Sequence, residues 1–404
     1  MNNTITHDIM RNENMLAVLR CIQENGQIYR RDIKAITGLS WGSISTIVND
    51  LLERGVIRET KNSNSVKGRN PSVIDICTEN TCIIGVDINI AGITVVQMDL
   101  KCHLIFSINE EIANKGKDRI LEQIFNLVDS IFSKSGKESR KVVGIGIAMQ
   151  GFVDCEKGIA RYSPYFTQWE NVPLKEMFEE RYRRPAFVDH SPNCMALFET
   201  WIGVAKGVSN LFFIRLGMSI GSSIIIDNRI LNGADGNAGE FGHVTMKPDG
   251  EECSCGNRGC LETLSSGRSI LNQAVKRIKN GEKSVITELI GQKPLESIDM
   301  ETVYRAFHMG DRLCIDILDG MALYLGIAIS NAINILNPEL VVIGGNMAQY
   351  ESLFISRVKD IVEKRTWKFS KKSILVSTNK NNTAAIGAGL KIVRKVFDGS
   401  IGMA

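Results

Sequence analysis

The 404-residue chain has no uninterrupted apolar stretch as long as a membrane span. Its longest apolar stretch, Leu323–Leu336, carries Ser330, Asn331 and Asn334 inside it, whereas a transmembrane helix needs about 20 consecutive, mainly apolar residues. The first fifteen residues, MNNTITHDIMRNENM, contain no apolar core of a signal peptide. We therefore expect a cytoplasmic protein with no membrane partner.

The chain also lacks a large excess of charge of either sign and any repeat of solenoid length. Because its net charge is only +3, a basic surface for nucleic acid has to be local. The 44% of apolar residues is typical of a globular protein. A chain of this length exceeds one ordinary hydrophobic core, so we expect two or three domains.

The N-terminal segment predicts three helices followed by a β-hairpin. Apolar residues at helical spacing predict a first helix over Met15–Ile22, and a second is expected over Arg30–Thr37, closed by Gly38. Ser40 is a favourable N-cap for a third helix, SWGSISTIVNDLLERG, which stops at a glycine. The segment that follows has strand-like residues at both ends and a polar tip, as in the wing of a winged helix-turn-helix.

Short polar residues line one face of the third predicted helix. Its apolar stripe is formed by Ile44, Ile47, Val48 and Leu51, so small or hydrogen-bonding residues cover the opposite face. A helix that enters the major groove needs such a face, because base edges are contacted by short polar side chains near the backbone. The predicted DNA-binding residues are Ser40, Trp41, Gly42, Ser45, Thr46, Asn49 and, at the wing tip, Lys67 and Arg69.

The charge of this region agrees with a nucleic-acid partner. Eight Lys or Arg residues stand against four acids between Arg30 and Arg69, an excess that can anchor DNA phosphates. A three-helix interaction module with a solvated basic loop is the alternative. The predicted wing makes this alternative less favourable.

Three of the ten cysteines cluster near a histidine. His243, Cys253, Cys255 and Cys260 form the pattern H-x9-C-x-C-x4-C, which supplies the four ligands of a structural zinc site. Gly256 and the glycine at 259 allow a tight loop around an ion. All four positions are filled by protein ligands, so we predict structural zinc. Unrelated free thiols beside a buried histidine are the alternative.

After Cys77, β-branched runs alternate with helical stretches such as Arg119–Ser133 and Asp316–Leu336, which predicts an α/β fold. Within this part, NAGEFGHVTMKPDGEECSCGNRGCLET closely resembles the signature of the ROK family. That family joins bacterial sugar kinases and sugar-responsive repressors on a two-lobed, actin-like ATPase fold. The segments VVGIGIAMQGFVD, YSPYFTQWENVPL, FVDHSPNCMALFE, ILNGADGNAGEFGH and INILNPELVVIGG resemble further family segments in family order.

The resemblance covers nearly everything after Cys77, and the N-terminal segment resembles the repressor branch, including its GLS turn and GRNP wing. It implies a winged helix-turn-helix over residues 1–76. A first α/β lobe would comprise residues 77–193 with 384–404. A second lobe, with the zinc loop, would comprise residues 194–383.

The sequence departs from the kinases of this family at three places. The first phosphate loop, Asp87–Thr94, lacks its central glycine, and the second, Leu216–Ser223, has fewer glycines than the kinases. Where kinases have an Asn-Asp pair whose Asp activates the sugar hydroxyl, this chain has His190-Ser191. A serine does not replace a carboxylate base, so we predict no enzyme activity. His190 as a substitute base is the weaker interpretation.

The resemblance also implies a sugar pocket. Glu240, His243 and Glu262 match family residues that contact sugar hydroxyls, Gly151 matches the loop beneath them, and His190 stands where a sugar-contacting Asn is expected. His243 would bind zinc through one ring nitrogen and face the sugar with the other. The alternative is that these residues are relics of ancestry and bind no ligand.

We therefore predict a repressor of carbohydrate-metabolism genes whose affinity for operator DNA changes when a sugar or sugar phosphate binds. A homodimer or homotetramer is expected, because paired recognition helices read a pseudo-palindrome. Two alternatives stay open, an active ATP-dependent sugar kinase with an accessory DNA-binding domain and a ligand-independent regulator controlled by a protein partner. The residue types encode neither the identity of the sugar nor the sign of regulation.

Overall fold

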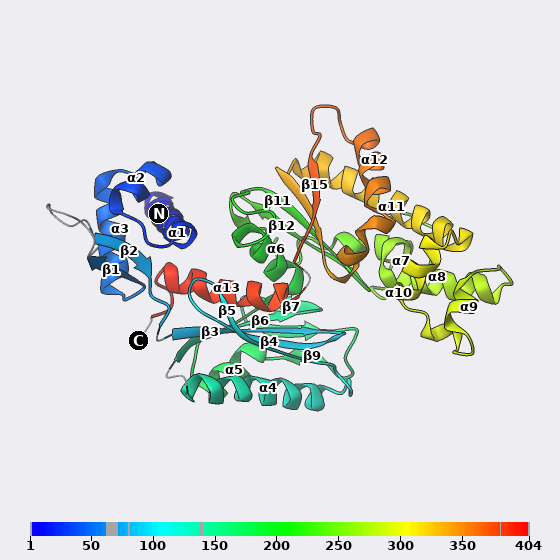
Figure 1. Ribbon diagram of the computed structural model, residues 1–404, viewed down its shortest axis with the longest axis horizontal. Coiled ribbons are helices and arrows are strands. Elements are labelled where there is room, and N and C mark those ends of the chain that lie inside the picture. Colours follow the sequence, from blue (N-terminus) through cyan, green and yellow to red (C-terminus); the bar gives the residue numbers. More distant parts are fainter. Residues whose placement is uncertain (1, 62–71, 80, 138–139, 380, 403–404) are drawn as a thin grey trace. The chain divides into compact units, whose positions relative to one another are not determined.

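The computed structural model describes residues 2–61, 72–79, 81–137, 140–379 and 381–402. The chain divides into two units, each of which is described by itself (Figure 1). The first unit comprises Met1–Cys194 and Ala384–Ala404, and the second comprises Met195–Thr383. The first unit therefore consists of two stretches of sequence separated by the whole of the second.

The N-terminal part of the first unit contains three helices and a hairpin. These are α1 (Asn2–Asn25), α2 (Arg30–Thr37), α3 (Trp41–Glu53), β1 (Ile57–Lys61) and β2 (Ser72–Ile76). The two strands pair antiparallel, which confirms the predicted wing, although its tip with Lys67 and Arg69 lies outside the described residues. The second and third helices are as predicted. The first starts thirteen residues earlier than predicted, because the segment before Met15 has no apolar periodicity to reveal it.

The rest of the first unit is built on a five-stranded sheet of order β10-β6-β3-β4-β5. Its elements are β3 (Thr81–Asn89), β4 (Gly92–Met98), β5 (Leu104–Glu110), α4 (Lys117–Lys137), β6 (Lys141–Met149), β7 (Phe152–Asp154), β8 (Ile159–Tyr162), β9 (Glu170–Val172), α5 (Leu174–Tyr182), β10 (Ala186–His190) and α13 (Thr383–Phe397). Helix α6 (Ser191–Trp201) begins in this unit, and its residues from Met195 onward belong to the second. Strands β10, β6 and β3 are parallel to one another, so their carboxyl ends lie at the same edge of the sheet.

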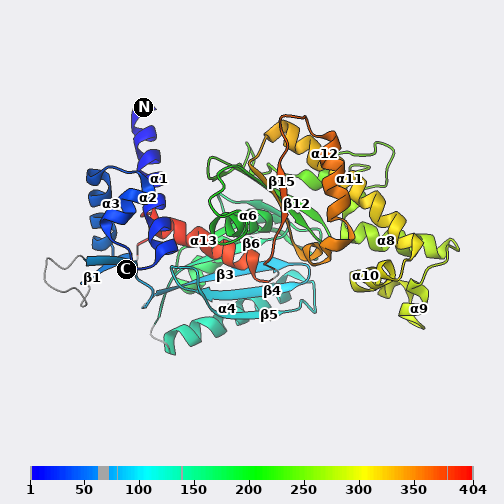
Figure 2. The same cartoon turned by 45° about the horizontal axis from the view of Figure 1, so that its top comes forward.

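Helices α4 and α13 lie on opposite faces of this sheet (Figures 1 and 2). Apolar side chains of α4, such as Ile124 and Val128, share a buried core with the sheet. Helix α13 lies much closer, with its backbone directly against the strands. A Cβ atom added at Gly85 or Gly146 would come within 1.9 Å of a carbonyl oxygen of α13. Glycine at these strand positions is therefore a requirement of close helix–sheet packing.

The second unit contains another five-stranded sheet, of order β13-β12-β11-β14-β15, surrounded by helices. Its elements are β11 (Leu211–Leu216), β12 (Ile220–Ile226), β13 (Arg229–Ile230), η1 (Phe241–His243), α7 (Leu261–Ser265), α8 (Gly267–Lys279), α9 (Ile286–Ile290), η2 (Leu295–Ser297), α10 (Met300–His308), α11 (Arg312–Leu336), β14 (Leu340–Gly344), η3 (Asn346–Leu353), α12 (Ile355–Arg365) and β15 (Ser373–Val376). The two sheets and their helices confirm the expected α/β class.

Helix α11 is the central core helix of the second unit. Among the described residues it is the single helix long and apolar enough to cross a membrane, but 61% of its apolar window is buried in the protein. Its inward side chains, including Leu318 and Leu325, belong to the main hydrophobic cluster of the unit. The apolar character of α11 is explained by this burial.

Candidate DNA-binding, ligand-binding and metal sites

The polar face of α3 is directed outward. Ser40 caps the helix by accepting a 3.1 Å hydrogen bond from the backbone N–H of Ser43, as expected for an N-cap serine. Ile44, Ile47, Val48 and Leu51 are buried, whereas Gly42, Thr46 and Asn49 are exposed and Ser45 is half-buried. The apolar stripe thus fixes the helix on the three-helix core and leaves its short polar residues accessible.

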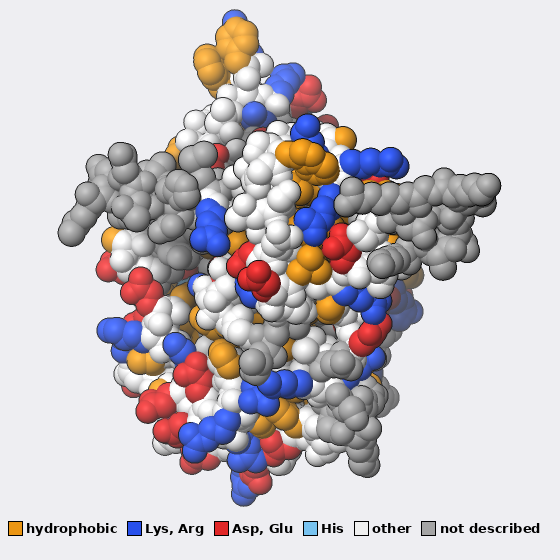
Figure 3. Space-filling model, turned by 90° about the vertical axis from the view of Figure 1, so that its left-hand side faces the viewer, with side chains coloured by type: hydrophobic (Ala, Val, Ile, Leu, Met, Phe, Trp, Pro, Cys, Tyr) orange, Lys and Arg blue, Asp and Glu red, His pale blue; other side chains and the backbone are white. Residues whose placement is uncertain are grey.

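Basic side chains of α2 surround this face. Arg30 donates a 3.2 Å hydrogen bond to Oδ1 of Asn49 and pairs with Glu59 on β1, so it holds the Asn49 amide in place. Lys34 lies 5.9 Å from the ring centroid of Trp41, whose side chain is 52% exposed. Lys and Arg side chains are interspersed with acidic ones on the side of the protein in Figure 3.

The carboxyl ends of β3, β6 and β10 bring Asp87, Gly151 and His190 together within the first unit. His190 Nδ1 lies 3.1 Å from the carbonyl oxygen of Gly151, at a glycine with φ of 137° whose added Cβ would lie 2.5 Å from a backbone oxygen. Nε2 of His190 is buried and has no hydrogen-bond partner among the described residues. A polar group of a bound ligand would satisfy this nitrogen.

Ser191 lies at the start of α6 and contacts the end of β3. Its hydroxyl donates a 3.1 Å hydrogen bond to Oδ1 of Asp87, while Oδ2 of Asp87 accepts one of 2.8 Å from Asn89. The residue at the expected position of the kinase base is therefore a neutral donor to another carboxylate. This geometry provides no proton acceptor at position 191.

Both predicted phosphate loops use their backbone N–H groups internally. In the first, Ile90 donates to the Gln150 side chain at 3.1 Å and Ala91 to the Asn89 side chain at 2.8 Å. In the second, Gly217 donates to the Ser219 carbonyl at 3.0 Å and Ile220 to Oε2 of Glu262 at 2.9 Å. Phosphate binding by such loops needs free N–H donors, and these four N–H groups are already hydrogen-bonded.

A buried ion pair beside His190 was not predicted from the sequence. Lys391 Nζ on α13 lies 2.5 Å from Oδ2 of Asp189, and Oδ1 of Asp189 accepts bonds from Asn193 and the His190 backbone. Burial acts to raise the pKa of Asp189, but the Lys391 cation and Asn193 outweigh it and lower that pKa. The available signal was Lys391 directly after the apolar run AAIGAGL.

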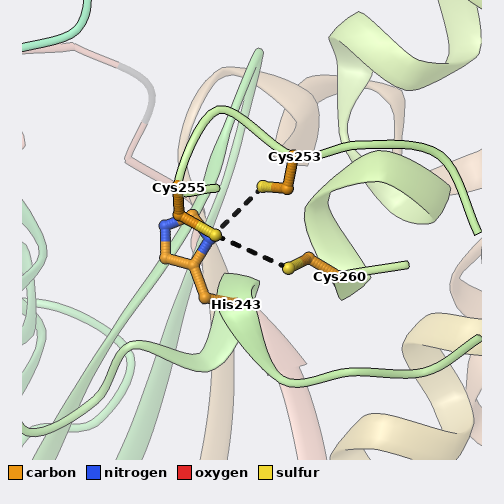
Figure 4. A group of neighbouring side chains, drawn as sticks. All are labelled: His243, Cys253, Cys255 and Cys260. Carbon is orange, nitrogen blue, oxygen red and sulfur yellow. Dashed lines mark hydrogen bonds between the residues drawn. The ribbon is translucent and has the colours of Figure 1, made fainter. Parts of the chain in front are cut away.

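The predicted metal ligands come together in the second unit (Figure 4). The donor atoms of His243, Cys253, Cys255 and Cys260 all lie within 4.8 Å of one another. Nδ1 of His243 lies 3.6 Å from the Cys253 sulfur, and the Cys255 and Cys260 sulfurs are 3.7 Å apart. Three thiols and one imidazole match the donor set of a tetrahedral metal site. This group can therefore hold a metal ion.

The local chain geometry builds this metal group. His243 ends the turn η1, and Gly259 has a φ of 64° where an added Cβ would lie 1.5 Å from the Lys247 carbonyl oxygen. Burial acts to raise the pKa of Cys255, but hydrogen bonds from the Asn257 backbone and the two other thiols of the group outweigh it and lower that pKa. A thiolate at Cys255 favours cation binding.

Two predicted sugar-contacting carboxylates lie beside the metal group. Nε2 of His243 is 3.8 Å from Oε2 of Glu240, so its two ring nitrogens face the thiols and this carboxylate. Glu262 is in the first turn of α7, which begins directly after Cys260. The structure thus brings Glu240 and Glu262 near the metal ligands of the second unit, and Gly151 and His190 together in the first.

The chain is similar to known proteins over almost its whole length. Residues 83–395 match the ROK family, and residues 11–58 match a winged helix-turn-helix DNA-binding family. The chain is 30% identical to the xylose repressor of Caldicellulosiruptor bescii, over 94% of this chain and 95% of that protein. It is 28% identical to the DNA-binding transcriptional dual regulator NagC of Escherichia coli K12, over 97% of this chain and 95% of NagC.

A solved structure is similar over almost the full length. It is a ROK family transcriptional regulator described as a homologue of the Escherichia coli Mlc protein, with 27% identity and a TM-score of 0.82, covering 96% of this chain and 97% of that one. The fold and the winged helix-turn-helix define a transcriptional regulator with a sugar-kinase-like sensor. The chain belongs to the ROK family. The predicted family and fold are confirmed, and a repressor is favoured over a kinase or another enzyme.

Proposed function

We propose that the chain is a sugar-responsive repressor that binds operator DNA through α3. The observation that carries the proposal is the outward polar face of α3, held in place by its four buried apolar residues. Ser45, Thr46 and Asn49 would contact base edges, and Ser40, Trp41 and Gly42 would lie at the end of α3 that enters the groove. Lys67 and Arg69 of the wing would contact phosphates.

The sensor is proposed to bind a sugar or sugar phosphate. In the first unit, the orphan Nε2 of His190 and the Gly151 loop support this assignment. In the second unit, Glu240, His243 and Glu262 offer groups that accept hydroxyl hydrogen bonds. Relatives of this chain are named xylose repressor and N-acetylglucosamine repressor. These two sugars are therefore the first effectors to test.

The metal is proposed to be structural zinc, held by His243, Cys253, Cys255 and Cys260. All four ligands come from the chain, which matches structural rather than catalytic zinc sites. Because Cys260 immediately precedes α7, the bound ion would fix the start of the helix that carries Glu262. The ion would thereby stabilise one side of the sugar-binding surface and take no part in chemistry.

The domain limits and the assembly are also proposed. The winged helix-turn-helix would comprise residues 1–76, the first lobe residues 77–193 with 384–404, and the second lobe residues 194–383. A homodimer or homotetramer would present paired recognition helices to a pseudo-palindromic operator. We propose that the protein acts in the cytoplasm.

DNA binding can be tested by fluorescence anisotropy with fragments of the DNA upstream of the protein's own gene. Ser45→Ala and Thr46→Ala are each expected to weaken specific binding about 5- to 100-fold, because a lost base contact costs about 1–3 kcal/mol. Ser133→Ala removes an exposed serine of α4 and serves as the matched control. Unchanged specific binding in both α3 variants would reject the recognition face.

Sugar binding can be tested by thermal shift with xylose, N-acetylglucosamine and their phosphates. A ligand at 100 times its dissociation constant adds about 2.7 kcal/mol of stability. Glu240→Gln and His190→Ala are expected to remove the shift caused by any ligand that binds the wild type. The absence of a shift with all four compounds, together with unchanged operator affinity in their presence, would contradict this effector class.

A further inference from the structure

Arg54 connects the proposed recognition helix to the last helix of the chain. It is the C-cap residue of α3, and its Nη1 lies 3.1 Å from Oδ2 of Asp50, one turn earlier. Its Nη2 donates to the carbonyl oxygens of Val396 and Phe397, the second at 3.1 Å, at the C-terminus of α13. A cation at this end of a helix interacts favourably with the helix dipole.

Helix α13 also carries Lys391, which forms the buried pair with Asp189. The side chains of Lys391 and Asp189 are 24% and 4% exposed. Asp189 directly precedes His190, the residue with the orphan ring nitrogen, and accepts a 2.8 Å hydrogen bond from the His190 backbone. The strand end that would contact the ligand is therefore tied to α13 by a short charged contact.

The stretch of α13 between these two contacts is short and firmly packed. Lys391 and Phe397 are six residues apart, which is about 9 Å along a helix. Nearer its start, the backbone of α13 touches β3 at Gly85 and β6 at Gly146, and an added Cβ at Gly387 would lie 1.8 Å from the Cys194 carbonyl oxygen. Between Lys391 and Phe397, the side chains of Ile392, Val393 and Val396 are fully buried, so this stretch of the helix is packed along its length.

Other contacts hold the winged helix-turn-helix on the first lobe without α13. Gln23 on α1 donates a 2.9 Å bond to the Lys101 carbonyl, and Lys101 Nζ lies 2.7 Å from Oδ1 of Asp75 on β2. These contacts fix α1 and the wing to the turn between β4 and β5. Arg54, in contrast, connects α3 directly to α13.

We propose that α13 couples the ligand-facing end of β10 to the recognition helix α3. The Asp189–Lys391 pair connects β10 to α13, and Arg54 is a positioning residue that connects α13 to α3. This inference rests on the proposed function for its biological meaning. Displacement of His190 by a ligand would shift the Asp189–Lys391 pair and α13. Arg54 would then change the orientation of α3 relative to the wing, which is held separately.

Hydrogen exchange of the full-length protein without ligand or DNA tests the connection directly. Lys391→Met is expected to speed amide exchange at least about threefold in α13 and in the second half of α3. In an Arg54→Met background the same change should affect α13 alone. If Lys391→Met destabilises the fold, Lys391→Met with Asp189→Asn removes both charges and avoids an unpaired buried carboxylate.

Arg181→Met is the matched control, because it breaks the Arg181–Asp129 ion pair of the same unit away from α13. It should leave exchange in α3 unchanged. The proposal is overturned if α3 exchange does not respond to the Lys391 variants, or responds equally with and without Arg54. These readouts need no operator or sugar, so failure of the repressor proposal would be seen separately as absent DNA binding.

A functional readout follows for a sugar that alters operator affinity. With xylose or N-acetylglucosamine as the probe, Arg54→Met should retain sugar binding by thermal shift and operator binding within about fivefold. The sugar-induced change in operator affinity, typically about 5- to 150-fold in allosteric proteins, should fall toward onefold. Arg54→Lys should recover part of it, since a cation at the C-terminus of α13 is restored. Full retention of the response in Arg54→Met would contradict the proposed role.

Discussion

The Ser191 hydroxyl donates a 3.1 Å hydrogen bond to Oδ1 of Asp87, joining the start of α6 to the end of β3. In the kinases that the sequence resembles, a carboxylate is expected at position 191. A carboxylate in this chain would lie directly beside Asp87, and two close carboxylates do not both ionise readily. Serine removes the general base and at the same time donates a hydrogen bond to Asp87.

Ser191→Asp is expected to make the protein less stable as the pH rises. Repulsion from Asp87 would raise the folded-state pKa of one carboxyl above its unfolded value of about 3.9. The loss of folding stability is therefore absent at lower pH and grows as the carboxyl ionises, reaching about 1–3 kcal/mol at pH 8. Thermal unfolding at pH 5 and pH 8 measures it, with the neutral Ser191→Asn as control. Equal pH profiles for the two variants would refute the expected repulsion.

Removal of one metal ligand is expected to release the metal. Purified wild type should contain about one zinc ion per chain, and Cys255→Ser should contain much less. We expect the melting temperature of the variant to fall by about 4–8 °C, corresponding to roughly 2 kcal/mol in a unit of this size. Elemental analysis and calorimetry measure both effects. Cys77→Ser, which lies outside the metal group, should change neither, and zinc-free wild type with an unchanged melting temperature would exclude the site.

Trp41 provides a fluorescent probe of operator binding. Its ring is 52% exposed at the start of α3, where bound DNA would exclude water and alter its emission. Emission should therefore change on titration with operator DNA, and Trp41→Phe should lose most of that change. Trp367, 62% exposed in the second unit, is the matched position, so Trp367→Phe should keep the response. An unchanged emission response in Trp41→Phe would show that operator DNA does not bind next to Trp41.

Asp311 stabilises the core helix α11. Its carboxylate caps the helix at the Cys314 N–H at 2.8 Å and also accepts from Val285 at 2.7 Å. Burial acts to raise the pKa of Asp311, but these backbone bonds outweigh it and lower that pKa. Its stabilisation is thus present above the unfolded pKa and lost as the pH falls through the folded value. Asp311→Ala should cost about 1–2 kcal/mol at pH 7.

Urea unfolding of Asp311→Ala and wild type at pH 7 and near pH 3 measures this difference. The difference in free energy of unfolding between wild type and Asp311→Ala should be smaller at the lower pH, where the Asp311 carboxyl becomes protonated. Asp316→Ala is a suitable control, because Asp316 is an exposed residue of the same helix and its carboxylate pairs with Arg277 at the surface. A gap that stays constant with pH would show that the charge of Asp311 is not responsible.

Local sequence signals predicted the elements and residues that lie close together along the chain. Within about fifteen residues, Gly38 ends α2, Ser40 caps the start of α3, and the apolar stripe of α3 defines its buried face. The four metal ligands likewise fall within one short loop. Each of these predictions depends on spacing that a single segment contains.

Contacts between distant segments gave no such signal. Arg54 and Phe397 are 343 positions apart, and Asp189 and Lys391 are 202 positions apart. Arg54 looks like an ordinary cation at a helix end, and its role depends on where α13 terminates in three dimensions. Only the lysine inside an apolar helix hinted at a buried acid, and nothing local identified Asp189 as that acid.

Helix α13 belongs to the first unit but follows the whole second unit in the sequence, and this order has a consequence for biosynthesis. Residues Met195–Thr383 are synthesised before α13, which takes on the order of ten seconds or more at ~5–20 residues per second. During that interval the glycine-lined face of the first sheet is uncovered, and Arg54 has no helix end to bind. The recognition helix of a nascent chain can therefore fold before it is connected to the sensor through α13.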